Sequence, residues 1–343
     1  MGERTLLRWW RAPLWLLEVG TGAKSFVDNP ILGSEGLNRR GLHVARLKLA
    51  HWIAWWRRRR LAEAVPSEWR EQFDRDGYVE VRDFLPTQEF ARLRDTLLGC
   101  EFDTREQQQG NTITRRVPVG PDLLRRAPDL HRLIRDRSWK SLLAYVASTR
   151  SAPLYYIQTI LTGHAEGAAD PQLNLHADTF HPSLKAWLFL TDVTDDQGPL
   201  TYVAGSHRLT LERLAWERAR SVTVKESDRL SQRGSLRIEP HELPALGLPP
   251  PKRFSVPANT LVVIDTCGFH ARGNSDKPTV RAEIWAFVRR SPFVPWTGLD
   301  LLSWGPLASR RADWMMAMFD RLDRLGLKKQ HWRPAGRRRP IDP

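Results

Sequence analysis

His176 and Asp178 are the residues whose types and spacing most directly predict chemistry in this chain. They are separated by one residue and follow the apolar-alternating stretch 173–175. In an extended strand, side chains two positions apart point to the same side, so an imidazole and a carboxylate can reach one metal together. His270 follows the strand-like run 261–265 and is the candidate for a third ligand from a distant strand.

Two histidines and one carboxylate occupy one face of a metal and leave three positions open. That arrangement suits ferrous iron that must bind a co-substrate and oxygen, whereas zinc more often takes a closed or water-completed tetrahedral site. Arg281 stands eleven residues beyond His270, at the start of the next strand-like run. Its guanidinium can bind the distal carboxylate of a keto diacid through two hydrogen bonds while the keto acid end chelates the iron. The spacing therefore predicts Fe(2+), 2-oxoglutarate and O2.

Further polar and aromatic residues near these positions are weaker candidates. Gln158, on the strand before the first ligands, and Trp187, on the strand after them, are predicted to line the cofactor pocket, although ordinary barrel packing would explain both equally well. His181 is close to His176 in sequence, and His207 lies in a Gly-Ser-His-Arg turn, where hydrogen bonding is the commoner role. We expect neither of them to bind the metal.

The elements that must position these residues are helices first and strands afterwards. Helical patterns occupy 67–76, 87–98 and 121–148, and a short alternating strand covers 77–81. Later strand-like runs cover 154–161, 184–190, 200–203, 260–264 and 280–288. Short strands after helices that can cover one face predict a mainly β fold with helical support (α+β), built on a double-sheet jelly roll.

The same pass along the chain predicts the domain boundaries. A catalytic domain covers 67–309, and the proline-rich stretch at about 209–253 is an insertion between strands. Residues 310–343 form a carboxyl-terminal helix and a basic tail whose last arginines, 337–339, are expected to be flexible. The helix is expected to dock on the core rather than act as a lid, through an apolar stripe at helical spacing that consists of Trp314, Met315, Met318, Phe319, Leu322 and Leu325. Residues 1–66 form a separate, tryptophan-rich helical segment, in which 29–41 reads as a loop between two helices.

Residues 1–66 hold six of the fifteen tryptophans, placed beside arginines as in Arg8–Arg11 and Trp55–Arg60. At helical spacing, one apolar stripe is predicted to include Leu42, Ala45, Leu49, Trp52, Ile53 and Trp56. Indole rings lie at headgroup depth in a membrane interface and arginines pair with lipid phosphates, so this segment favours a peripheral membrane anchor. The alternative is a helix packed onto the catalytic domain, which leaves the arginine run without a role.

Charge and cysteine content restrict the possible partners and the compartment. The net charge of +14 is concentrated at the ends: 1–66 carry twelve Lys/Arg against five Asp/Glu, and 310–343 carry ten against four. Basic ends are expected to bind an anionic surface, with a membrane favoured over nucleic acid, or else to be solvated tails that keep the protein soluble. Two cysteines, Cys100 and Cys267, cannot organise a disulfide framework, and no apolar run is long enough to span a bilayer. A cytoplasmic protein is expected, peripheral on the cytoplasmic face of the membrane.

The surrounding motifs resemble the phytanoyl-CoA dioxygenase family of Fe(II)- and 2-oxoglutarate-dependent oxygenases. The segment 73–85, with Phe-Asp-Arg-Asp-Gly-Tyr and Arg-Asp-Phe-Leu, is similar to that family's opening segment, and 190–208 is similar to the stretch after its first two ligands. The resemblance covers roughly 67–292. It implies a double-stranded β-helix fold, with His176, Asp178 and His270 as iron ligands and Arg281 as the 2-oxoglutarate clamp. The presence of Asp178 favours hydroxylation over halogenation, because related halogenases have a small residue there.

Three functions from different classes are compatible with these residues. The first is a dioxygenase that hydroxylates an unactivated C–H bond of a lipid-linked or acyl substrate and releases succinate and CO2. The second is a soluble oxygenase of a small metabolite, in which the amino-terminal helices are structural. The third is a non-catalytic membrane or nucleic-acid adaptor, which would have a damaged metal set, whereas all four required residue types are present. Neither the substrate nor the oligomeric state follows from the sequence.

Overall fold

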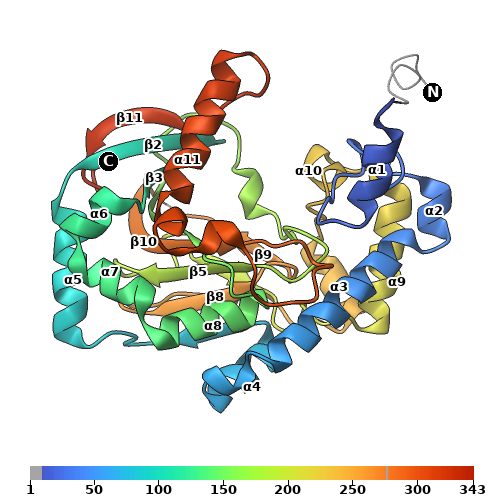
Figure 1. Ribbon diagram of the computed structural model, residues 1–343, viewed down its shortest axis with the longest axis horizontal. Helices are drawn as coiled ribbons and strands as arrows, with labels where there is room; N and C mark the ends of the chain where they lie inside the picture. Colours follow the sequence, from blue (N-terminus) through green and yellow to red (C-terminus); the bar gives the residue numbers. More distant parts are fainter. Residues whose placement is uncertain (1–9, 276) are drawn as a thin grey trace.

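Two antiparallel sheets form the core of the computed structural model, which describes residues 10–275 and 277–343 (Figure 1). Trp9, part of the predicted anchor, and residue 276 lie outside the described residues. The large sheet has the strand order β1-β8-β5-β10-β4-β3-β2-β11. Its strands are β1 (Tyr78–Val81), β2 (Phe102–Gln109), β3 (Thr112–Pro118), β4 (Leu154–Thr162), β5 (Leu184–Phe189), β8 (Leu261–Asp265), β10 (Thr279–Val288) and β11 (Arg333–Arg338).

The small sheet faces the large one and has the order β7-β6-β9, with β6 (Leu200–Tyr202), β7 (Lys252–Arg253) and β9 (His270–Arg272). Isolated bridges extend it, because His176 pairs with both His270 and Arg237. Two facing antiparallel sheets with helical support are the jelly-roll core that the strand spacing predicts, so that prediction is confirmed. Five strand-like runs match β4, β5, β6, β8 and β10 within two residues at each end.

Alternation along β10 shows why these sequences form a two-layered core. Arg281, Glu283, Trp285 and Phe287 point into the space between the sheets, whereas the residues between them pack against the helices on the other face. The large sheet therefore has a polar and aromatic inner face and an aliphatic outer face. Because successive side chains of a strand point to opposite faces, a strand between two layers needs residues suited to each face in alternation, and β10 has them.

Helices cover the outer face of the large sheet and one end of the molecule (Figure 1). Those along the sheet are α5 (Thr87–Gly99), α6 (Pro121–Arg126), α7 (Pro128–Arg135) and α8 (Arg137–Ala147), which follow α4 (Ser67–Asp76). Those gathered at the other end are α1 (Ala12–Val19), α2 (Glu35–Arg39), α3 (Leu42–Arg59), α9 (Leu211–Thr223) and α10 (Arg229–Gln232). The long α11 (Gly305–Arg324) follows β10. Short 3-10 turns are η2 (Ala62–Ala64), η3 (Pro171–Leu173), η4 (Val224–Glu226), η5 (Pro240–Leu246) and η6 (Leu301–Ser303).

The apolar stripe predicted on α3 is covered by protein only in part: Ile53 is buried, whereas Leu49 and Trp52 are exposed. The buried face consists instead of His43, Arg46, Leu47, Ala50, Ile53, Ala54 and Arg57. Two of its arginines donate to main-chain oxygens: Arg46 donates to three carbonyls of residues 19–23, and Arg57 to the carbonyl of Val294. The arginines therefore have a structural role in fixing α3 to the core, which a pattern based on apolar residues alone cannot detect.

Other expectations at the two ends also need correction. The short α2 lies inside the stretch predicted to be a loop. The last arginines, expected in a flexible tail, are partly in regular structure: Arg337 and Arg338 belong to β11, which pairs with β2 at the edge of the large sheet. Of the predicted apolar stripe on α11, Trp314 and Met318 are exposed, and the fully buried residues are Ala312 and Met316. Among the helices described, none combines the length and the hydropathy that a bilayer span requires.

Candidate active site

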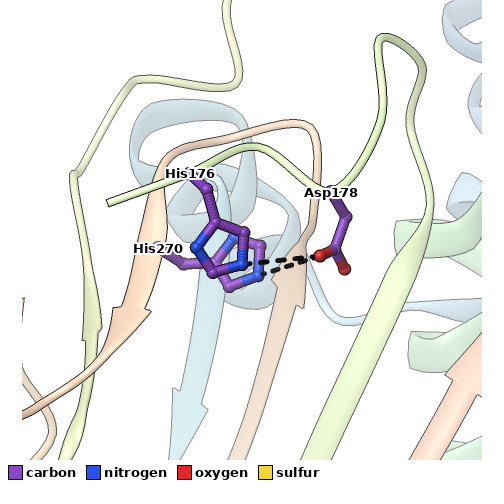
Figure 2. Close-up of side chains that lie close together, drawn as sticks. All are labelled: His176, Asp178 and His270. Carbon is purple, nitrogen blue, oxygen red and sulfur yellow. Dashed lines mark ion pairs between the residues drawn. The ribbon is translucent and has the colours of Figure 1, made fainter. Parts of the chain in front are cut away.

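His176, Asp178 and His270 lie together, as Figure 2 shows, with both imidazole rings turned toward one carboxylate oxygen. One ligand atom from each residue can be chosen so that all three lie within 4.8 Å of one another. Asp178 Oδ1 lies 3.6 Å from His176 Nε2 and 3.8 Å from His270 Nε2. The structure thus brings together three side chains separated by up to 94 positions.

The backbone that holds these residues is more irregular than the predicted strand. Residues 171–173 form a 3-10 turn, and His176 takes part only in isolated bridges. Two main-chain hydrogen bonds of 3.0 Å join His176 to His270 in both directions. The N–H of Asp178 donates to the carbonyl of Thr266, 2.9 Å away. Hydrogen bonds to the segment 266–270, rather than a regular strand, therefore hold His176 and Asp178 in place.

Hydrogen bonds at the far side of each ring fix which nitrogen faces the third residue. Nδ1 of His176 donates to the carbonyl of Asn174 at 2.8 Å, and Nδ1 of His270 donates to that of Gly268 at 3.0 Å. Because a carbonyl can only accept, the proton lies on Nδ1 and the lone pair lies on Nε2. Each imidazole therefore presents an unprotonated nitrogen to the centre of the cluster.

The protonation states of the cluster suit a cation. Burial, together with the positive charge of Lys185, lowers the pKa of His270 to about 3, so the ring is neutral at pH 7. Burial raises the pKa of Asp178, but the positive charge of the neighbouring Lys185 outweighs this effect, and the pKa of Asp178 lies well below its usual value. Neutral imidazole and ionised carboxylate are the forms that bind metal.

The donor set fits iron(II). Two imidazole nitrogens and one carboxylate oxygen form a face of three ligands, and the other side of the cluster opens into a pocket of about 380 Å³. A closed tetrahedral site would need a fourth protein ligand, and among the described residues no fourth His, Cys, Asp or Glu joins this group. Three ligands with open positions are the arrangement used by non-haem Fe(II) oxygenases.

Arg281 lines the same pocket and offers a place for a carboxylate. Its Nη1 donates to the carbonyl of Gly198, while its buried Nε has no partner within the described residues. Burial lowers the pKa of Arg281 to about 10, which still leaves the guanidinium charged at pH 7. A charged group with an unused buried donor fits the distal carboxylate of 2-oxoglutarate.

Gln158 and Trp187 also line the pocket, from β4 and β5. Gln158 Nε2 donates to Oε1 of the buried Glu283 at 2.7 Å, and Arg116 Nε donates to Gln158 Oε1 at 2.8 Å. Burial raises the pKa of Glu283 despite the nearby Arg281. Gln158 thus bridges the guanidinium of Arg116 and the carboxyl group of Glu283 in the pocket wall, a role that its position in the sequence does not reveal.

Sequence reasoning missed two lysines at the metal cluster. Lys185 Nζ lies 2.7 Å from Asp178 Oδ2 and 3.4 Å from His270 Nε2, and Lys24 Nζ donates to the main-chain oxygen of Asp178. Alternation along β5 could have found Lys185, because it lies two positions before Trp187 and faces the same side. No local pattern could have found Lys24, which lies in the loop between α1 and α2.

The two other histidines considered lie outside the cluster, as expected. His181 Nδ1 donates to the carbonyl of Pro182, and its Nε2 is buried without a hydrogen-bond partner in the described part of the chain. His207 packs against Phe73, with 5.5 Å between ring centroids. Burial lowers the pKa of both histidines to about 3.

Comparison with known proteins gives one family and several distant structures. The phytanoyl-CoA dioxygenase family model matches residues 73–245, half of the chain, and ends before His270 and Arg281. No curated protein sequence matches. The solved structures include the non-haem α-ketoglutarate-dependent epimerase SnoN from nogalamycin biosynthesis, at 22% identity over 68% of this chain and 91% of that one, with a TM-score of 0.44. HygX from Streptomyces hygroscopicus, with nickel, 2-oxoglutarate and hygromycin B bound, is 17% identical over 65% and 86%, with a TM-score of 0.41.

Proposed function

Since the chain belongs to the phytanoyl-CoA dioxygenase family of Fe(II)- and 2-oxoglutarate-dependent oxygenases, we propose that it hydroxylates an unactivated C–H bond of an acyl or lipid-linked substrate. The single observation that carries the activity is the convergence of His176, Asp178 and His270 at the wall of a pocket that also contains Arg281. In the proposed reaction, substrate, O2 and 2-oxoglutarate give the alcohol, succinate and CO2. Iron(II) would supply the capacity to activate O2.

The protein's own residues have separate tasks in this proposal. The two imidazoles and Asp178 hold the metal on one face, and the bonds from each Nδ1 keep the rings in one orientation. Arg281 binds the distal carboxylate of 2-oxoglutarate. Trp187 and Trp285 line the pocket, and their bulk reduces the space open to water around the reacting groups.

The test combines consumption of 2-oxoglutarate with detection of product. Acyl and lipid extracts are incubated with the protein, Fe(II) and 2-oxoglutarate under ¹⁸O2, and a species heavier by one labelled oxygen is expected. The His270→Ala variant serves as the control, because it removes one ligand and should give no such species. An enzyme that consumes no 2-oxoglutarate with any extract would refute the proposal.

The lipid-linked substrate is supported by the exposed face of α3. Trp52 and Trp55 are 61% and 51% exposed, and Leu49 beside them is also exposed. The Arg59 guanidinium lies 4.8 Å from the Trp55 ring centroid, and Arg60 lies 3.4 Å from that of Trp56. Indoles with flanking arginines match the headgroup region of an anionic bilayer. We assign this face to the cytoplasmic surface of a membrane that holds the substrate.

Membrane binding is tested with point variants, because deleting α3 would also remove the buried Arg46 and Arg57 and so damage the fold. Intact protein is expected to sediment with phosphatidylglycerol vesicles and much less with phosphatidylcholine vesicles. A Trp52→Ser/Trp55→Ser double variant should lose most of this binding while its unfolding midpoint stays unchanged. Equal sedimentation of both proteins would contradict the assignment to this face of α3, and sedimentation of neither would favour a soluble oxygenase of a small metabolite.

A further inference from the structure

Two lysines from separate parts of the chain contact the metal-binding Asp178, and an arginine lines the same pocket. Lys185 Nζ is 2.7 Å from Asp178 Oδ2, and Lys24 donates to the main-chain oxygen of Asp178. Arg289, which directly follows β10, lines the same pocket. Lys24, Lys185 and Arg289 thus stand against the single carboxylate of Asp178 in this region. One negative charge cannot balance three positive ones, so the region is positive before any ligand binds.

Counting charges over the pocket wall gives the same result. The carboxyl groups of the wall are Asp178 and Glu283. The cationic residues of the wall are Arg116, Lys185, Arg272, Arg281 and Arg289. Asp170, outside the wall, pairs with Arg272. A divalent metal and the 2-oxoglutarate dianion would cancel each other, so a positive surplus is left for the substrate.

Part of the positive surplus lies where β5 begins and the neighbouring β10 ends. In the register of β5 with β10, Lys185 stands opposite Phe287, and Arg289 follows two residues later. The Arg289 guanidinium lies 5.4 Å from the Phe287 ring centroid, which in turn stacks parallel on Trp285 at 5.6 Å. An aromatic wall therefore runs up to a pair of cations, which is the arrangement that a molecule with an apolar body and an acidic end would need.

We propose that the substrate carries an anionic group, a carboxylate or a phosphate, and that Lys185 and Arg289 bind it. The inference rests on the proposed oxygenase function, because it concerns the same pocket. Lys185 also lies 3.4 Å from His270 Nε2, so an anion bound to it lies beside the metal cluster. The oxidised carbon is therefore close to the acidic group, and the apolar part of the substrate extends along Trp285 and Phe287.

Binding, rather than turnover, provides the test. Protein loaded with Ni(II) and saturated with 2-oxoglutarate is titrated with dodecanoate, with dodecyl phosphate and with uncharged dodecanol, each below its micelle concentration, and tryptophan fluorescence reports binding. At least one acid is expected to bind ten times more tightly than dodecanol, and the comparison of the two acids identifies which anion is preferred. Lys185→Met and Arg289→Gln should each weaken binding of that acid about tenfold and leave dodecanol unchanged.

Matched controls come from α8, on the outer face of the sheet, where Lys140→Met and Arg137→Gln remove the same charges from exposed positions. Both should bind the acids as the intact protein does. Arg289 is itself exposed, so its variant will fold even if Lys185→Met disturbs the metal cluster. Acids that bind no better than dodecanol would overturn the proposal. Acid binding that weakens as the 2-oxoglutarate concentration is raised would also overturn the proposal, because Lys185 and Arg289 would then bind the co-substrate. The ¹⁸O experiment is independent of either result.

Discussion

Substituting Arg58 tests whether α3 is an integral part of the catalytic domain. The Arg58 Nη2 lies 2.7 Å from Oδ2 of Asp265, whose side chain is only 1% exposed. The same guanidinium donates to the carbonyls of Tyr145 and Val146. The change Arg58→Met keeps the aliphatic stem and leaves Asp265 as a buried carboxylate without its counter-ion.

The expected cost follows from the remaining partners of Asp265. Breaking a buried ion pair by removing one member typically costs about 3–5 kcal/mol. Oδ1 still accepts hydrogen bonds from the N–H groups of Ser183 and Cys267, at 3.1 and 3.2 Å. These bonds compensate part of the charge, so we expect the lower end of that range, about 3 kcal/mol. Urea unfolding followed by tryptophan fluorescence measures the change.

The pH dependence gives a second signature of this ion pair. Burial raises the pKa of Asp265, but the charge of Arg58 and its hydrogen bond outweigh that effect and hold the pKa below its usual value. The contribution of the pair is therefore complete above the unfolded-state pKa of about 3.9 and is lost as the pH falls through the lower folded-state pKa. In Arg58→Met, Asp265 is free to take up a proton, so the difference from the intact protein should narrow as the pH is lowered from neutrality.

Two control variants make this test decisive. Arg59→Met removes the neighbouring exposed arginine and is expected to change stability by at most about 0.5 kcal/mol. Asp265→Asn combined with Arg58→Met removes both charges, and its cost should be smaller than the sum of the two single variants by about 1 kcal/mol or more. Equal effects of Arg58→Met and Arg59→Met, or strictly additive single variants, would refute the reasoning.

Three further outcomes are expected. Arg281→Lys should raise the KM for 2-oxoglutarate about tenfold or more with a smaller change in kcat, because a lysine cannot form two parallel hydrogen bonds to a carboxylate; steady-state kinetics in 2-oxoglutarate would reveal an unchanged KM if the clamp lies elsewhere. Burial lowers the pKa of His181 and His207 to about 3, below the unfolded value of about 6.5. The contribution of these two rings to stability should therefore be complete above pH 6.5 and fall by roughly 3 kcal/mol per pH unit well below it, and His270, with the same low pKa, adds to the loss. Equal urea midpoints at pH 7 and pH 5 would contradict this. Gly268→Ala would bring a methyl group to 1.9 Å from the Tyr202 hydroxyl, so both stability and Co(II) binding by the apo-protein should decrease, and normal Co(II) affinity would show that the turn before His270 tolerates the shift.

The sequence by itself determined the strands that carry the site and the types of residue on them. Alternation in 280–288 and 184–190 predicts which side chains share a face, because the strand period of two depends only on local geometry. The order of His176, Asp178, His270 and Arg281 along the chain, each next to a strand-like run, was sufficient to predict an iron and 2-oxoglutarate site.

Only the tertiary structure decided what surrounds that site and what α3 contacts. Lys24 reaches Asp178 from 154 positions away, through a loop with no recognisable pattern. The charge of Arg46 and Arg57 predicts exposure, but both are buried because main-chain oxygens of other segments accept hydrogen bonds from their guanidinium groups. Local sequence records hydrophobicity and periodicity, whereas the partner of a buried charge is fixed by how the whole chain packs.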